Sequence, residues 1–379
     1  MVDKESRPVF QLSASLGCDW KNIERADEET EQAKKDLNTL LQRDVGEKFA
    51  SEDANLVVFG SLGRGEWIDW LSDLDWTFLV DGQCKAGHFW IAQGIRDALR
   101  SERRQGQNGT WQYRFAEPGP SGTFGNMGFS HQLIHLIGGQ EDTNKNTTQR
   151  ILLLLESLPI GEANAHQRVL KAIIQRYLEE EPHVIAKDQS QFKVPRFLLN
   201  DIVRFWRTMA VDFASKQRDR GGAGWGLRNA KLRMSRKLIF VSGLVTCFSC
   251  SLDETLQSKI ARDMSDPRAA RNLNLAHLQD HILRYVSNTP LDIVALAVGQ
   301  HGIEASVAGN LFSAYDDFLG LMADPEKREH LMKLKADASR DDKVFEQVRE
   351  CSERFSEALK VIFFQHPRLS VLTQKYGVF

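Results

Sequence analysis

The segment from Val57 to Asp81, VVFGSLGRGEWIDWLSDLDWTFLVD, constrains the fold more than any other part of the chain. The apolar run that opens it is typical of a buried strand, and it stops at Gly60–Ser61 in a tight turn. A turn with a short helix follows, and DLDWTFLVDG then predicts a second strand that ends at Asp81–Gly82. The order predicts two strands joined through a Gly-Ser turn.

Two carboxylates, Asp73 and Asp75, open the second predicted strand. Residues two apart face the same side of a strand, so both side chains are expected to project together. Neighbouring carboxylates repel each other unless a cation lies between them. A pair of Mg²⁺ ions roughly 3.5–4 Å apart suits such ligands and serves phosphoryl displacement. We therefore expect Asp73 and Asp75 to be metal ligands and catalytic residues, with Mg²⁺ or Mn²⁺ as the cofactor.

Three residues around the first turn are candidate phosphate ligands. Gly60 lets the backbone approach a triphosphate closely, and Ser61 with the N–H groups that follow it can hold phosphate oxygens. Arg64 adds a charge-assisted contact to the same phosphates. An Asp-x-Asp alone is commonly a solvated strand edge, so the prediction depends on its combination with the Gly-Ser turn.

The combination, with eleven residues between Ser61 and Asp73, resembles the nucleotidyltransferase superfamily of the DNA polymerase β type. GSLGRGE…SDLDW is similar to the branch that contains the protein-PII uridylyltransferase and the glutamine synthetase adenylyltransferase. The resemblance covers roughly residues 50 to 240 and is strong over the first thirty. It implies transfer of an NMP from an NTP, such as ATP, to an acceptor hydroxyl with release of pyrophosphate.

The acceptor implied by that branch is a protein hydroxyl. Synthesis of a nucleotide second messenger and addition to RNA 3′ ends are the alternatives among enzymes. A non-catalytic nucleotide sensor is a third hypothesis, because the superfamily normally supplies a third carboxylate that this sequence does not place.

The third carboxylate is expected on a later strand, and Gly125 to Ile137 is the candidate strand. Glu141 and Asp142 follow it and are possible ligands, although acids there also suit the start of a helix. His131 and His135 are candidate bases or ligands, but lone histidines beside a strand are more often packing residues.

The stretch LLLLESLPIGEAN, from Leu152 to Asn164, resembles a Leu-Leu-Glu segment that follows the catalytic domain in that branch. Further on, the basic helical stretch from Arg228 to Lys237 carries Lys231 and Ser235 one turn apart. The resemblance implies that these two residues bind the nucleotide, and the alternative is a solvated basic helix face.

From Thr147 onward nearly the whole chain has helical periodicity. The sequence therefore predicts an α+β fold. A polymerase-β-like nucleotidyltransferase domain with an N-terminal helix is expected over residues 1–145. An all-helical domain that binds nucleotide and acceptor is expected over residues 146–379.

Composition limits which binding partners and which cellular compartment are expected for the chain. The 49 basic residues nearly balance the 51 acidic ones, so no global field attracts nucleic acid or an anionic membrane. No stretch approaches the ~20 apolar residues of a membrane span, and Leu238 to Phe248 is expected to be a buried helix. Cys247 and Cys250 lie in that helix and are expected to be buried and structural. Without a secretory signal, a cytoplasmic protein with no membrane partner is predicted.

Overall fold

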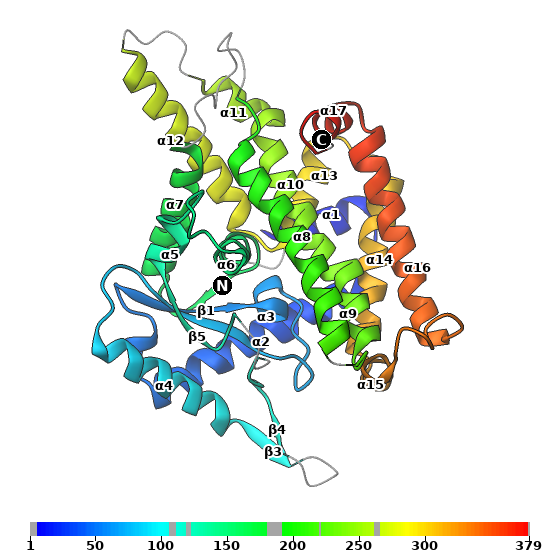
Figure 1. Ribbon diagram of the computed structural model, residues 1–379. Coiled ribbons are helices and arrows are strands. Elements are labelled where there is room, and N and C mark those ends of the chain that lie inside the picture. Colours follow the sequence, from blue (N-terminus) through cyan, green and yellow to red (C-terminus); the bar gives the residue numbers. More distant parts are fainter. Residues whose placement is uncertain are drawn as a thin grey trace. The chain divides into compact units, whose positions relative to one another are not determined.

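The computed structural model describes residues 6–105, 111–118, 123–179, 192–219, 221–260 and 266–377. They belong to two compact units (Figure 1). We call Glu24–Tyr177 the mixed unit; the helical unit combines Met1–Ile23 with Leu178–Phe379. The fold is α+β and mostly helical. The boundary at 145/146 that the sequence suggests falls inside the mixed unit.

The mixed unit is built around a four-stranded sheet of order β5-β2-β1-β6. β1 pairs antiparallel with β2 and with β6, whereas β2 pairs parallel with β5. The pairing of β6 with β1 keeps residues beyond 145 in this unit. The elements are α2 (Lys21–Asp44, shared with the helical unit as far as Ile23), η2 (Glu47–Phe49), β1 (Ala54–Phe59), α3 (Gly60–Arg64), β2 (Asp75–Val80), α4 (Ala86–Ser101), β3 (Arg103–Gln105), β4 (Trp111–Tyr113), β5 (Asn126–Phe129), α5 (Ser130–Ile134), α6 (Asn144–Leu155), β6 (Leu158–Ile160) and α7 (Asn164–Glu179).

The two strands predicted around the Gly-Ser turn are present as β1 and β2. Their register pairs Ala54 with Val80 at one end and Phe59 with Asp75 at the other. Leu56 and Val58 of β1 face the same apolar core as alternate residues of β2, and leucines of α2 pack into it. The rigid pairing fixes the position of Asp75 beside the end of β1.

The third predicted strand is shorter than expected. β5 covers only Asn126–Phe129, and the chain then turns into α5, where a strand to Ile137 was predicted. At Gly128 a side chain would lie 2.7 Å from Cγ2 of Thr77, so the two strands approach closely only because residue 128 is glycine.

The helical unit contains the N-terminal segment as well as the second half of the chain. Its elements are α1 (Pro8–Leu16), α8 (Arg196–Asp219), α9 (Trp225–Lys231), η3 (Leu232–Arg236), α10 (Lys237–Leu252), α11 (Glu254–Ser258), α12 (Pro267–Val286), α13 (Pro290–Gln300), α14 (Ala305–Ala323), α15 (Pro325–Lys333), α16 (Lys343–Lys360), η4 (Val361–Gln365), α17 (Pro367–Leu372) and η5 (Thr373–Gly377). Proline or glycine marks several of the breaks, as the sequence suggests.

Long-range contacts hold the N-terminal segment in the helical unit. The guanidinium of Arg7 donates to Asp292 of α13 at 2.6 Å, and the Val9 N–H donates to the other oxygen of that carboxylate. The Trp20 ring stacks on Phe312 of α14 with centroids 5.0 Å apart. The first helix therefore packs with the C-terminal helices, and Met1–Ile23 lie outside the mixed unit although the expected domain began at residue 1.

α10 is the buried helix that the sequence predicts. Leu238, Cys247, Phe248 and Cys250 are all buried. Burial raises the pKa of the Cys250 thiol to about 12 and that of Cys247 well above its usual range, so both remain protonated. In the part of the chain that the structure describes, one helical stretch, Trp225–Ser258, is apolar and long enough to cross a membrane, but 67% of its apolar window is buried inside the fold. Such burial is consistent with the core helix of a soluble protein.

Candidate functional site

The Gly60 turn brings the backbone against a carboxylate. Gly60 follows β1 directly, has a φ of +66°, and begins α3. A methyl group at this position would lie 2.7 Å from Oδ2 of Asp75 on the neighbouring strand. Any other residue would therefore be strained in its backbone and would collide with the carboxylate. Glycine is required here because it makes room for Asp75.

A second close approach fixes the short helix after the turn. A methyl group at Gly63 would lie 2.0 Å from the backbone oxygen of Glu156, which follows α6. The helix α3 can thus lie directly against the end of α6 only with glycine at residue 63. The two glycines of the Gly-Ser-Leu-Gly sequence therefore allow two close contacts, one of Gly60 with Asp75 and one of Gly63 with Glu156.

Asp73 and Asp75 lie on either side of a buried residue, and their expected projection to one side of the chain stays a prediction. Leu74 between them is fully buried, while Asp73 is exposed and Asp75 is half-buried. Asp73 precedes β2 and is held by the neighbouring segment, because the Leu74 N–H donates to the Ala116 carbonyl at 2.8 Å. Within the described residues, the Asp73 carboxylate has no hydrogen-bond or ion-pair partner. The pair is therefore accessible from solvent and fixed at its backbone.

Arg64 points toward two buried acids. Its Nη1 donates to Oε2 of Glu156 at 2.6 Å and its Nε donates to Oε2 of Glu66 at 2.9 Å. The other Glu156 oxygen accepts from the Gly60 N–H at 3.2 Å. Burial raises the pKa of the Glu156 carboxyl, and the charge of Arg64 acts in the opposite direction. Arg64 and Glu156 together hold the Gly60 turn, and a direct phosphate contact from Arg64 stays a prediction.

Sequence reasoning missed the role of Glu156. It lies 96 residues after Gly60, and the only signal was its place in the Leu-Leu-Glu stretch. Because the Gly60 N–H donates to this carboxylate, Glu156 fixes the turn that is expected to let the backbone approach a triphosphate. The Ser61 hydroxyl is half-buried and, within the described residues, has no hydrogen-bond partner, so it remains a candidate phosphate donor.

The candidates for a third carboxylate lie in other contacts. Asp142 is buried, and both of its oxygens accept from the buried guanidinium of Arg150, at 2.8 and 3.2 Å. Glu141 is exposed, and α6 begins after both acids, at Asn144. His131 lies on α5 and His135 follows its last residue; both are exposed, with ring centroids 5.1 Å apart. Among the described residues no group of three or more His, Cys, Asp and Glu side chains is arranged to hold a metal ion.

Lys231 and Ser235 belong to the helical unit. Lys231 ends α9, and Ser235 lies in η3, a π-helical turn, where it is buried. A π-helical turn inserts an extra residue in a helix and is frequent at functional sites. Their predicted role as nucleotide ligands stays a prediction.

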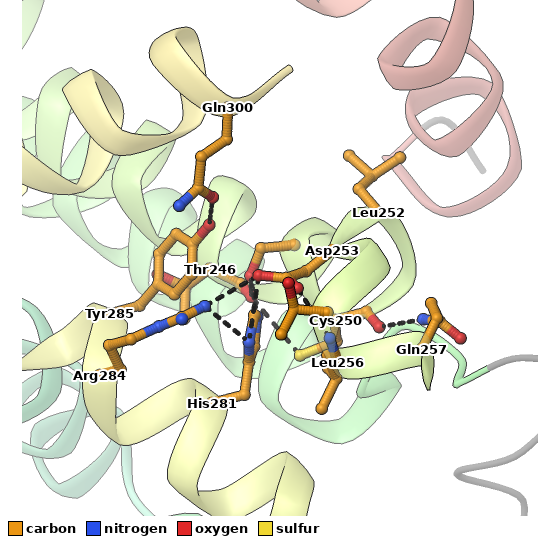
Figure 2. A network of polar contacts seen from close by, with 12 residues as sticks. Thr246, Cys250, Leu252, Asp253, Leu256, Gln257, His281, Arg284, Tyr285 and Gln300 are labelled. Carbon is orange, nitrogen blue, oxygen red and sulfur yellow. Dashed lines mark hydrogen bonds and ion pairs between the residues drawn. The ribbon is translucent and has the colours of Figure 1, made fainter. Parts of the chain in front are cut away.

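Figure 2 shows a polar network in the helical unit around Asp253 and His281. The Asp253 carboxylate accepts from Arg284 at 2.8 Å, and His281 Nε2 lies 2.8 Å from the Ser249 hydroxyl. The residue types are those of a hydrolase triad, but the Ser249 hydroxyl is buried and donates to the Thr246 carbonyl. Burial lowers the pKa of His281 to about 4. The network therefore joins helices α10, α11 and α12 and presents no nucleophile to solvent.

Neither the protein-family models nor the curated proteins with which the chain was compared contain a match. The functional interpretation of the site therefore rests on its own residues and geometry.

Proposed function

We propose that the mixed unit is a metal-dependent nucleotidyltransferase that moves an NMP from an NTP to an acceptor hydroxyl. The observation that carries the proposal is the contact between the Gly60 turn and the Asp75 carboxylate, with the exposed Asp73 two residues away. Glycine accepts the positive φ of the turn and leaves room for the carboxylate, and an acidic pair beside it suits a bound cation.

The donor set fits Mg²⁺. This ion is usually bound through one or two carboxylates, substrate phosphates and water, without a cage made wholly of protein ligands. Asp73 and Asp75 would hold it together with the triphosphate. When bound, Mg²⁺ or Mn²⁺ neutralises phosphate charge and orients the reacting oxygens.

The residues of this chain position the metal-binding carboxylates and the substrate phosphates. Gly60 leaves the space that the Asp75 carboxylate occupies, and Glu156 with Arg64 holds the turn in that conformation. The Ser61 hydroxyl is available to donate to a phosphate oxygen. The acceptor oxygen attacks the α-phosphorus, pyrophosphate leaves, and the hydroxyl proton passes to solvent. Catalysis of this kind depends mainly on positioning and electrostatics.

The family resemblance supports a protein hydroxyl as the acceptor, a second nucleotide or an RNA 3′ end being the alternatives. A cytoplasmic location, where NTPs are available, is part of the proposal.

The test is incubation of the full chain with each α-labelled NTP and Mg²⁺ or Mn²⁺, alone, with RNA and with cell extract. Asp73→Asn and Asp75→Asn should each abolish label transfer. Asp97→Asn, which changes an exposed carboxylate on α4 of the same unit, should transfer label like the wild type. Absence of transfer in every lane, with nucleotide still raising the melting temperature, would replace the enzyme by a nucleotide sensor.

A further inference from the structure

The β3–β4 ribbon carries aromatic and basic side chains into solvent. Arg103 pairs with Tyr113, and Gln105 pairs with Trp111. Because side chains alternate along a strand, these four residues share one face of the ribbon. All six residues of the two strands are exposed, and the ribbon extends away from the sheet of its own unit (Figure 1). The face presents two aromatic rings about 7 Å apart along one strand.

Both arginines of β3 stack on tryptophans. The Arg103 guanidinium lies 4.4 Å from the ring centroid of Trp111, and that of Arg104 lies 4.1 Å from the Trp70 ring. Among the described residues, Trp70 is the one non-glycine residue with positive φ, at +63°. A bulky residue in that conformation is strained, and such strain is concentrated at functional sites. Stacking leaves the N–H edges of a guanidinium open to phosphate oxygens.

The arginines next to the ribbon, unlike Arg103 and Arg104, are paired with carboxylates. Arg100 pairs with Glu117, and Arg114 pairs with Asp36 and Asp69. In contrast, within residues 24–105, 111–118 and 123–177, neither Arg103 nor Arg104 forms an ion pair with a carboxylate. Within these described ranges the ribbon therefore keeps two positive charges without a carboxylate partner, in a chain whose net charge is only −2.

The ribbon leads directly to the acidic pair. The Arg114 N–H donates to the Glu102 carbonyl at 2.9 Å and closes the base of the ribbon. Two residues later, Ala116 forms a parallel bridge with Asp73. The three residue steps from Tyr113 to Ala116 span at most about 10 Å. A chain lying along β4 can thus reach the carboxylates.

We propose that this ribbon is the acceptor-binding surface and that it binds single-stranded nucleic acid, which favours the nucleic-acid alternative over the protein hydroxyl that the family resemblance supports. Bases stack on Trp111 and Tyr113, and phosphates contact Arg103 on the same face, while Arg104 on the opposite face adds positive charge. Ring faces beside cations are the combination that single strands bind. A peptide acceptor would gain little from two uncompensated arginines unless it were acidic, whereas every nucleotide of a single strand carries both a ring and a negative charge.

The assignment of an acceptor rests on the proposed transferase function. In that reaction a terminal hydroxyl oxygen of the strand forms the bond to the α-phosphorus of the NTP. The bond from that phosphorus to the bridging oxygen breaks, pyrophosphate leaves, and the proton passes to solvent.

The experiment measures binding without turnover. Fluorescence anisotropy of the full chain with fluorescein-labelled oligouridylate, the matching oligothymidylate and a mixed-sequence duplex gives affinities over a series of salt concentrations. Trp111→Ala should weaken single-strand binding about 5- to 150-fold. Trp90→Ala, a change of the 77% exposed tryptophan on α4, is the matched control and should have no effect.

A second pair of variants tests the electrostatic contribution of the ribbon arginines to strand binding. Arg103→Ala should make the slope of log K against log salt shallower by about 0.7, which is the contribution of one phosphate contact on a single strand. Arg43→Ala, which removes an exposed arginine already paired with Asp44, should leave the slope unchanged.

Saturable binding that is stronger for single strands than for the duplex and is lost in the ribbon variants supports the proposal. Absence of binding, or equal losses with Trp111→Ala and Trp90→Ala, overturns it. Ribbon-dependent labelling of a protein in extract, without RNA binding, also overturns it. Asp75→Asn should bind the strand normally, so a wild type that binds but never transfers label would refute the transferase and leave the binding surface.

Discussion

Replacement of Gly60 by alanine tests the central geometry of the site. A methyl group at residue 60 would lie 2.7 Å from Asp75 Oδ2, whereas ordinary contact begins at 3.4 Å. The carboxylate must therefore move by about 3.4 − 2.7 = 0.7 Å. Asp75 is paired with Phe59 in the sheet, so the side chain has to rotate while its backbone stays in place.

The expected loss is mainly catalytic. A misplacement of about 1 Å costs roughly 100-fold in rate, so a displacement of this size should reduce the transfer rate about 10- to 100-fold. Positive φ adds a backbone penalty of about 1–2 kcal/mol for alanine, which should appear as a lower melting temperature. Both quantities are measured on the same preparation, by label transfer and by thermal unfolding.

Gly82→Ala separates the two effects. Gly82 also has a positive φ, +89°, but no atom lies within 4 Å of a methyl group placed there. The Gly82→Ala variant should lose about as much stability as Gly60→Ala but keep the transfer rate of the wild type. If both variants lose the same fraction of activity, or if Gly60→Ala keeps full activity when folded, the close approach to Asp75 has no catalytic role.

Three further predictions concern buried polar groups of the mixed unit. Glu156→Ala removes a buried acceptor and should cost about 1–3 kcal/mol in unfolding free energy and lower the transfer rate of folded protein, while Glu156→Gln should retain more of both. Asp142→Ala should cost about 3–5 kcal/mol in urea denaturation because it leaves the Arg150 guanidinium buried without its carboxylate; a loss below 1 kcal/mol would contradict this. Burial lowers the pKa of His166 from 6.5 to about 4, so the unfolded chain binds more protons between these values. Stability should therefore fall by up to about 3 kcal/mol as the pH drops through that range, and urea titrations of His166→Gln should show a flatter profile than the wild type.

Local patterns in the sequence predicted the local elements. The apolar run before Gly60 and the Asp-x-Asp before the next run define β1 and β2, and the apolar stretch around Cys247 defines a buried helix. Periodicity and turn chemistry act over a few residues, and that is the range in which these predictions hold.

Contacts between distant parts of the chain were not predictable in this way. Nothing near Arg64 indicates that its charge is matched by Glu156, 92 residues later, because such pairing depends on the packing of α3 against α6. The end of β5 at Phe129 was also not predicted, since the residues that follow are compatible with either a strand or a helix start. The expectation that both Asp-x-Asp carboxylates project to one side rests on strand alternation and stays a prediction, because β2 begins only at Asp75.

The packing of α1 with α13 has a consequence for synthesis of the protein. Arg7 must wait for Asp292, and at about 5–20 residues per second the intervening 285 residues take roughly 14 to 57 s to be made. The mixed unit is one continuous stretch and is complete in sequence once Tyr177 has emerged. During the interval Val9 and Trp20, which are buried in the finished protein, lack their packing partners on α13 and α14. The segment around Arg7 therefore reaches its native position only after α13 has been made.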